Sequence, residues 1–170
     1  MDLDSDVIRI KHLLRRAGFG ASPTEVQMFI AMGWEATADY LIEYQDVDDS
    51  ELENRLASLE LDVERNTPLQ QWWLFRMIYT KRPLQEKMVF FWHGLLTSSF
   101  RKIGTGPYMY NQYQLFREQA LGRYDVLLKA VARDPAMLAW LDSKVNKKKA
   151  PNENFARELM ELFSMGIGHY

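Results

Sequence analysis

Apolar residues recur at three- and four-residue steps along nearly the whole chain. Leu84, Met88 and Phe91 follow this spacing in one segment, and Phe155 and Leu159 follow it in another. Such spacing lines up one apolar face of an α-helix. No convincing alternating run of β-branched residues suggests a strand. The pattern therefore predicts an all-α protein with no sheet.

Helix starts repeat one signal, a capping residue followed by proline at the first helical position. Ser22-Pro23 is followed by Glu25, which can close a capping box, and Thr67-Pro68 and Asp134-Pro135 repeat the signal. Arg82-Pro83 is a weaker fourth case, because arginine is a poor capping residue. Glycine stands where helices are expected to end, at Gly18, Gly33, Gly122 and Gly166.

Spacing, caps and glycines together predict about ten helices. Their approximate spans are 5–17, 23–32, 34–44, 49–60, 68–80, 83–99, 107–121, 123–133, 135–142 and 153–165. The chain has 170 residues, no long linker and no fixed-period repeat. We therefore expect one domain over residues 1–170, built as an irregular orthogonal bundle of helices.

Composition and charge exclude several classes of protein. Hydrophobic residues make up 47% and charged residues 26%, as in ordinary globular domains. The absence of cysteine excludes disulfides, thiolate metal sites and cysteine nucleophiles. A formal net charge of -2 gives no general attraction to nucleic acid or to an anionic membrane.

The chain begins with acidic residues and lacks the apolar core of a signal peptide. No apolar run approaches the roughly 20 residues that a membrane span needs. We expect no membrane association and a cytoplasmic location for the chain as written. The basic segment from Lys144 to Lys149 has no interleaved aromatic residues. We expect it to be a solvated loop and expect no nucleic-acid partner.

Polar residues gather where a loop enters the last predicted helix. Asn152 suits the N-cap position, and Glu153 can pair with Arg157 four residues later. Asn154 and Glu158, together with Asp142, are then left as oxygen ligands or as a general-base cluster. The alternative is that the whole group caps a helix and pairs on its surface, and the sequence leaves both interpretations open.

His93 lies within the aromatic segment Phe91-Trp92-His93-Gly94. It could act as a base or a metal ligand, or it could be a core histidine with a satisfied hydrogen bond. The three histidines are His12, His93 and His169, and none shows the spacing of a helix-borne zinc site. A metal site would have to be assembled from distant segments, so the metal and any cofactor stay unknown.

Several blocks of the chain match one family. They are His12–Gly20 (HLLRRAGFG), Pro83–Met88 (PLQEKM) leading into Phe91-Trp92-His93, Ala130–Leu138 (AVARDPAML), Leu141-Asp142, Pro151–Phe163 (PNENFARELMELF) and Gly166-Ile167-Gly168. In these blocks the chain resembles the large bacterial family known as domain of unknown function 1800.

The resemblance implies no established activity. Members of that family are usually longer, many look exported, and their genes often lie beside those of a sulfatase-like family, which suggests a protein partner. The resemblance further implies that the chain is the N-terminal part of a longer family domain, with exposed apolar surface where that domain continues. It draws attention to residues that lie in the shared motifs, without assigning them roles: His93, Asp142, Asn152, Glu153, Asn154, Arg157 and Glu158.

Two functions of different classes follow as expectations. The first is part of a hydrolase-like or metal-dependent enzyme, with His93, Asp142, Asn154 and Glu158 as candidate catalytic residues. The second is a helical scaffold or partner-binding module without catalysis. In both, we expect Glu158 to be at least partly buried beside a partner, because an unpaired buried charge costs several kcal/mol.

Overall fold

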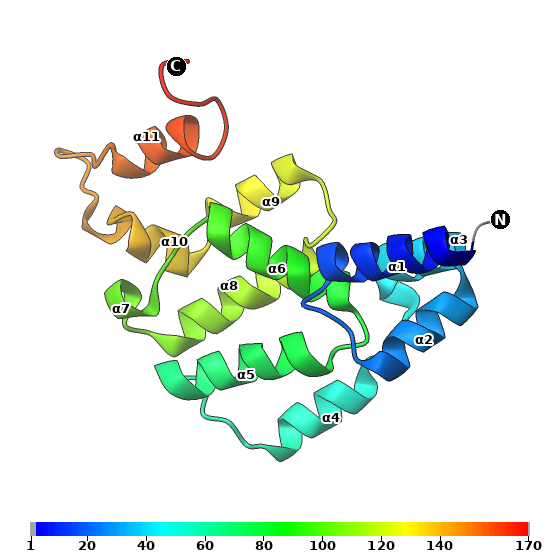
Figure 1. Cartoon of the computed structure of the whole chain (residues 1–170). Coiled ribbons are helices and arrows are strands. Elements are labelled where there is room, and N and C mark those ends of the chain that lie inside the picture. The colour runs from blue at the N-terminus through cyan, green and yellow to red at the C-terminus, as the bar shows by residue number, and fades with distance from the viewer. Residues whose placement is uncertain (1–2, 170) are drawn as a thin grey trace. The chain divides into compact units, whose positions relative to one another are not determined.

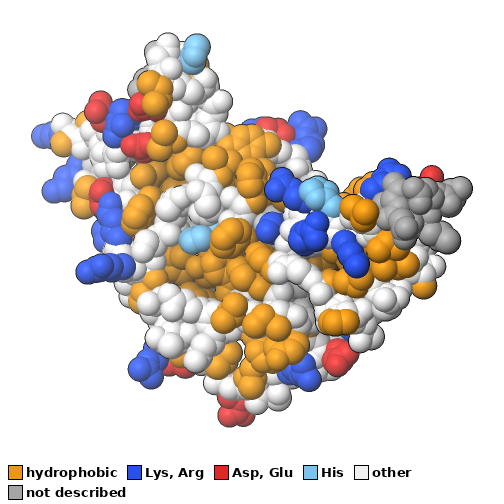
Figure 2. Space-filling model, viewed as in Figure 1, with side chains coloured by type: hydrophobic (Ala, Val, Ile, Leu, Met, Phe, Trp, Pro, Cys, Tyr) orange, Lys and Arg blue, Asp and Glu red, His pale blue; other side chains and the backbone are white. Residues whose placement is uncertain are grey.

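The structure is a computed structural model that describes residues 3–169, with side chains from residue 6 onward. Within this range the chain forms α-helices and two short 3-10 helices and contains no strand. Figure 1 shows these helices joined by short loops, and Figure 2 shows hydrophobic side chains gathered in patches on the surface. The all-α class predicted from the apolar spacing is confirmed.

The helices follow the chain in order. Their bounds are α1 (Leu3–Ala17), α2 (Pro23–Met32), α3 (Trp34–Ile42), η1 (Tyr44–Asp46), α4 (Ser50–Ser58), α5 (Asn66–Tyr79), α6 (Pro83–Leu95), α7 (Phe100–Ile103), α8 (Gly106–Glu118), α9 (Tyr124–Val131), α10 (Pro135–Trp140), η2 (Ser143–Val145) and α11 (Asn154–Glu161).

Three of the four predicted proline-containing starts are confirmed, and the weaker one at Arg82-Pro83 is among them, because α6 begins at Pro83. The Ser22 hydroxyl accepts from the Glu25 amide at 3.2 Å, and the Glu25 carboxylate accepts from the Ser22 amide at 2.6 Å. Asp134 caps α10 ahead of Pro135. The start predicted at Thr67-Pro68 is wrong, because α5 begins at Asn66. A first-turn amide has no helical partner, so proline is tolerated there without marking the first residue.

The helix expected over 83–99 ends at Leu95 instead. The Thr97 hydroxyl donates to the Gly94 carbonyl at 2.8 Å. Ser99 then accepts from the Arg101 amide and starts α7, a short helix that the spacing did not predict. Local side-chain bonds of this kind compete with the helix and end it early.

The chain divides into two compact units. Unit 1 contains the described residues up to Leu61 together with Gln70–Met88, and unit 2 contains Asp62–Leu69 and the residues from Val89 onward. The expectation that residues 1–170 act as a single domain stays a prediction.

The core of unit 1 forms where α1, α2 and α3 pack together. Ile10 and Leu14 from α1 and Phe29 from α2 are buried at its centre. The rings of Phe29 and Tyr40 meet edge to face, with their centroids 5.3 Å apart. This packing holds the loop between α1 and α2, and residues of that loop line a cavity.

The core of unit 2 forms around α8, which packs against α7, α9 and α10. Met109 and Phe116 from α8, Leu127 from α9 and Met137 from α10 are fully buried there. At the start of α8, a side chain on Gly106 would collide with the backbone of Glu64. Only glycine allows this close approach of the two segments.

Residues 144–149 form an exposed basic loop, as predicted from their charge. The 3-10 helix η2 overlaps the start of this loop, and an isolated backbone bridge joins Lys147 to Ala150 just after it. Elsewhere, the described helices include none with the length and apolar character required to cross a membrane.

Candidate functional site

The two asparagines before α11 fasten this helix to the end of α10. Asn152 Nδ2 donates to the carbonyls of Leu141 and Asp142 at 3.3 and 3.2 Å. Asn154 Nδ2 reaches the same Leu141 carbonyl at 3.4 Å. Both side-chain amides are therefore engaged in holding a loop together.

The helix start differs from its prediction by one residue. Glu153, and not Asn152, occupies the N-cap position of α11, and its side chain makes no capping bond. Asn152 Oδ1 still accepts from the amide of Asn154 at 2.9 Å, so it performs the expected bonding from one position earlier. An asparagine side chain reaches a backbone amide two residues ahead in an Asx-turn, which explains the shift.

Arg157 has other neighbours than the predicted Glu153. Its guanidinium lies 2.9 Å from Glu158 Oε1 and 3.3 Å from Glu161 Oε2. It also donates to Asn154 Oδ1 at 2.8 Å. Glu158 and Glu161 are more buried than Glu153, so the cation is held on their side of the helix.

The expectation that Glu158 is partly buried beside a partner is confirmed. Its side chain is 16% exposed, and the partner is Arg157. The carboxylate is therefore already neutralised by a cation on its own helix. A catalytic role for Glu158 stays a prediction.

Asp142 lies in the left-handed region of the backbone, with φ of 60°. Its carboxylate is 2.9 Å from the ammonium of Lys102. Lys102 also donates to the carbonyl of Trp140 and lies 5.3 Å from the centre of that ring. Asp142 thus anchors a lysine across the end of α10.

His93 packs against α8. Its ring meets the ring of Tyr113 edge to face, with the centroids 5.4 Å apart. Burial lowers the pKa of His93 and raises the pKa of Tyr113 to about 12. The described bonds that join Asp142, Asn154 and Glu158 to their neighbours do not include His93. The four candidates are therefore not shown to form one catalytic group.

A buried polar network in unit 2 was not predicted. Ser98 donates to Gln112 Oε1, and Gln112 Nε2 donates to Asp134 Oδ2 at 2.6 Å. The same Asp134 oxygen accepts from the Met137 amide at 2.9 Å. Burial raises the pKa of Asp134, although these hydrogen bonds act to lower it. The sequence signals Asp134 as a cap, but nothing in it indicates that Gln112 faces inward to meet it.

Among the described residues, no three His, Asp or Glu side chains lie close enough together to hold a metal ion. The motif residues instead pair with lysine, arginine and backbone carbonyls. These contacts hold the loop between α10 and α11 in place.

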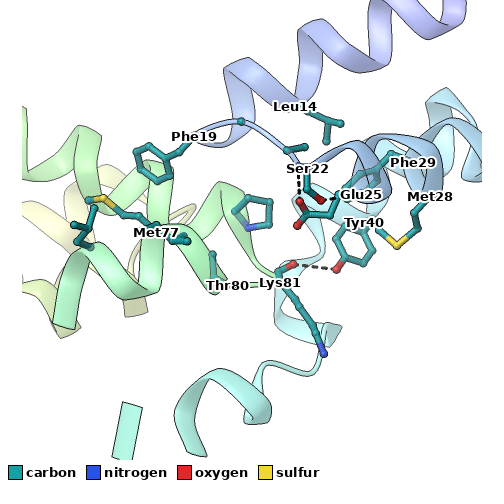
Figure 3. Close-up of a pocket in the computed structure, with 15 residues that line it drawn as sticks. Leu14, Phe19, Ser22, Glu25, Met28, Phe29, Tyr40, Met77, Thr80 and Lys81 are labelled. Carbon is teal, nitrogen blue, oxygen red and sulfur yellow. Dashed lines mark hydrogen bonds between the residues drawn. The ribbon is translucent and has the colours of Figure 1, made fainter. Parts of the chain in front are cut away.

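Unit 1 contains a cavity of about 750 Å³. Its walls come from the loop after α1, from α2 and α3, and from the end of α5. Figure 3 shows Phe19 and Met77 on one side of it and Met28 and Phe29 on the other. Most of the lining side chains are apolar, and several of them are substantially exposed.

Polar groups gather at one place on this cavity. The Ser22–Glu25 capping box lies there, and the Tyr40 hydroxyl donates to the Lys81 carbonyl at 3.0 Å (Figure 3). Burial raises the pKa of Tyr40, and the nearby Asp49 carboxylate raises it further. An apolar body with a few convergent polar groups is the usual make-up of a ligand site.

A smaller cavity of about 380 Å³ shares Ser22, Glu25 and Lys81 with the first. It adds Asp49, which is buried and accepts from the Thr80 hydroxyl at 2.7 Å and from the Lys81 amide at 2.9 Å. It also adds Glu51, whose hydrogen bond with the Lys81 ammonium lowers the pKa of Glu51 and raises that of Lys81.

None of the cavity residues was predicted as a site. They come from positions 14 to 83, on separate helices, with no motif that joins them. The one available signal was weak. Leu74 and Ile78 stand four residues apart in the second half of α5, and both line the cavity.

Comparison with known proteins identifies a family for the chain. Searches of curated proteins and of solved structures find nothing that matches the chain. A scan of family models matches residues 12–170 to the family described as "Protein of unknown function (DUF1800)". This match confirms the resemblance carried by the motifs, and the chain belongs to the DUF1800 family.

Proposed function

We propose that this chain is a helical binding module without catalysis, and that the 750 Å³ cavity of unit 1 is its binding site. The observation that carries the proposal is the cavity itself. Its volume falls within the roughly 300–1,000 Å³ typical of pockets for small molecules. Its lining combines an apolar wall with a small polar group at Glu25, Ser22 and Tyr40.

The exposure of the apolar wall supports this function. Leu74 is 56% exposed and Ile78 is 60% exposed, although both line the cavity. Covering such side chains removes apolar surface from water, which is worth about 25 cal/mol per Å². Met28 and Met77 add flexible side chains that adapt to differently shaped ligands. A partly apolar ligand would therefore be stabilised here.

The contacts of the motif residues support binding over catalysis. Asp142 pairs with Lys102, Glu158 pairs with Arg157, and both asparagines bind backbone carbonyls. A general base must reach the proton that it removes. Carboxylates held by neighbouring cations serve packing more directly than they serve proton transfer.

The test uses a neutral apolar probe, octan-1-ol, and the full chain with labelled methionine methyl groups. We expect octan-1-ol to shift the NMR signals of Met28 and Met77, which line the cavity. Met109 and Met137, buried in unit 2, serve as internal references that should not move.

The matched variants are Ile78→Ser and Ile8→Ser. Both isoleucines are exposed, 60% for Ile78 and 66% for Ile8, so neither change should affect folding strongly. Only Ile78 lines the cavity. Weaker binding in Ile78→Ser alone supports the proposal. Unmoved Met28 and Met77 signals at saturating octan-1-ol overturn it.

A further inference from the structure

Two charged residues, Glu25 and Lys81, line the 750 Å³ cavity, and their side chains point in different directions (Figure 3). Figure 3 shows the Glu25 carboxylate beside Ser22 and Tyr40, among the lining residues, whereas the Lys81 side chain extends away from them. The Lys81 ammonium is bound by Glu51 Oε2 at 3.0 Å. The negative charge thus faces the cavity, and the positive charge is already engaged outside it.

Glu25 has capacity left for a ligand. Its Oε2 accepts from the Ser22 amide at 2.6 Å. Its Oε1 accepts no hydrogen bond from any other residue that the structure describes. An ionised carboxylate can accept at both oxygens, so one oxygen is available to a donor in the cavity.

The smaller cavity beside it also carries more negative than positive charge. Around the smaller cavity, three carboxylates (Glu25, Asp49 and Glu51) face two cations (Arg55 and Lys81). Arg55 lies 4.9 Å from the centre of the Tyr79 ring, and Lys81 is held by Glu51. An approaching ligand therefore meets an excess of negative charge at the polar end of an apolar cavity.

We propose that this cavity binds an organic cation, a small molecule with an apolar body and a protonated amine that binds Glu25. The proposal rests on the binding function proposed above. The apolar body lies against Met28, Met77 and Ile78, and the amine donates to Glu25 Oε1. The Tyr40 ring, beside Glu25 in Figure 3, adds an aromatic surface that favours a cation.

An anionic ligand fits the same cavity poorly. Its head group would either lie beside the Glu25 carboxylate or have to separate Lys81 from Glu51. The first arrangement is repulsive, and the second gives up an existing ion pair. The charge of the ligand head group is therefore the property that a test of this proposal must vary.

The experiment compares three probes of equal chain length: octylamine, octanoate and octan-1-ol. At pH 7 the first is cationic, the second anionic and the third neutral. Binding to the full chain is followed through the Met28 and Met77 methyl signals. We expect octylamine to bind roughly three- to tenfold more tightly than octanoate, because an attractive exposed charge pair in one complex is replaced by a repulsive one in the other.

Glu25→Gln is the decisive variant. Glutamine at this position can still close the capping box, so α2 keeps its start while the charge is removed. We expect the preference for octylamine over octanoate to fall to within about twofold. Glu35→Gln is the matched control, because Glu35 is a first-turn glutamate of α3 that does not line the cavity.

A second measurement on the unchanged chain needs no variant. The preference for octylamine should weaken between about 0.02 M and about 0.5 M salt, since salt screens exposed charges. Octanoate that binds as tightly as octylamine, or a preference that survives in Glu25→Gln, overturns the inference. If octan-1-ol binds and the head group has no effect, only the inference fails. If no probe binds, the proposed function fails.

Discussion

Arg76 in unit 1 and Arg157 in unit 2 each contact two glutamates, but at opposite levels of burial. Arg76 is 2% exposed, lies 2.5 Å from Glu53 and 3.9 Å from the fully buried Glu86. Arg157 is 43% exposed beside Glu158 and Glu161. Removing one member of a buried charge cluster leaves an unpaired buried charge and lowers the stability strongly. In an exposed cluster, water replaces the lost partner.

The two regions therefore differ in which side chains they leave free to bind a ligand. In unit 1, Arg76 holds α5 from within, also packing 4.7 Å from the centre of the Trp72 ring. The same helix then presents Leu74, Met77 and Ile78 to an open cavity. In unit 2, the motif around Arg157 uses its polar atoms on its own loop. The region richer in polar motifs is thus the poorer candidate for a ligand.

The largest expected effect comes from Arg76→Ala. It removes the guanidinium from beside the buried Glu86 carboxylate and should lower the free energy of unfolding by about 3–5 kcal/mol. Urea denaturation of the full chain measures this. We also expect the Met28 and Met77 signals to lose their response to octan-1-ol.

Arg55→Ala is the control for this change, because Arg55 is an exposed arginine of the same unit. It should cost at most about 1 kcal/mol, the contribution of its exposed contact with the Tyr79 ring. If the two variants have equal stability, Arg76 does not hold the cavity wall and the comparison of the two arginines is wrong.

The next effect concerns Asp134, the buried cap of α10. Asp134→Ala removes the acceptor for both the Met137 amide and Gln112, and should cost about 2–3 kcal/mol. Asp134→Asn keeps an oxygen in this place and should cost less. Thermal and urea unfolding of both variants at pH 7 check this order.

The Asp134→Asn variant also tests the raised pKa. Because burial raises the folded-state pKa of Asp134, the carboxyl group stabilises the fold most below its unfolded pKa. That contribution is lost as the pH rises through the folded value. The stability of the unchanged chain relative to Asp134→Asn should therefore fall as the pH rises from acid to neutral values. A difference that rises over this range contradicts the assignment.

The smallest expected effect comes from Glu158→Gln. The pair with the half-exposed Arg157 should contribute about 0.5–1 kcal/mol, and less at high salt. Glu153→Gln, at the exposed N-cap, should be near neutral. Unfolding in urea at low and high salt checks both. Unchanged stability with loss of ligand binding in Glu158→Gln would favour a functional carboxylate, as in the enzyme interpretation.

Local signals predicted local structure well. The Ser22–Glu25 capping box and the Asp134 cap depend on atoms within three residues of one another, and both are confirmed. Helix ends were predicted less well, as at Leu95, because bonds from Thr97 and Ser99 compete with the helix. Arg157 shows the limit even within a helix. Spacing allowed a pair with Glu153, and side-chain burial selected Glu158 and Glu161.

The sequence by itself determined the helical class, most helix starts, the exposure of the 144–149 loop and the family to which the chain belongs. The helical class and the helix starts follow from periodicity and from contacts between near neighbours, the exposure of the loop follows from its charge, and the family is carried by the shared motifs. Only the tertiary structure decided that Arg76 is buried, that Gln112 meets Asp134, and that residues from 14 to 83 surround one cavity. Those features require segments distant in sequence to pack together, and no local pattern specifies which side chains then face inward.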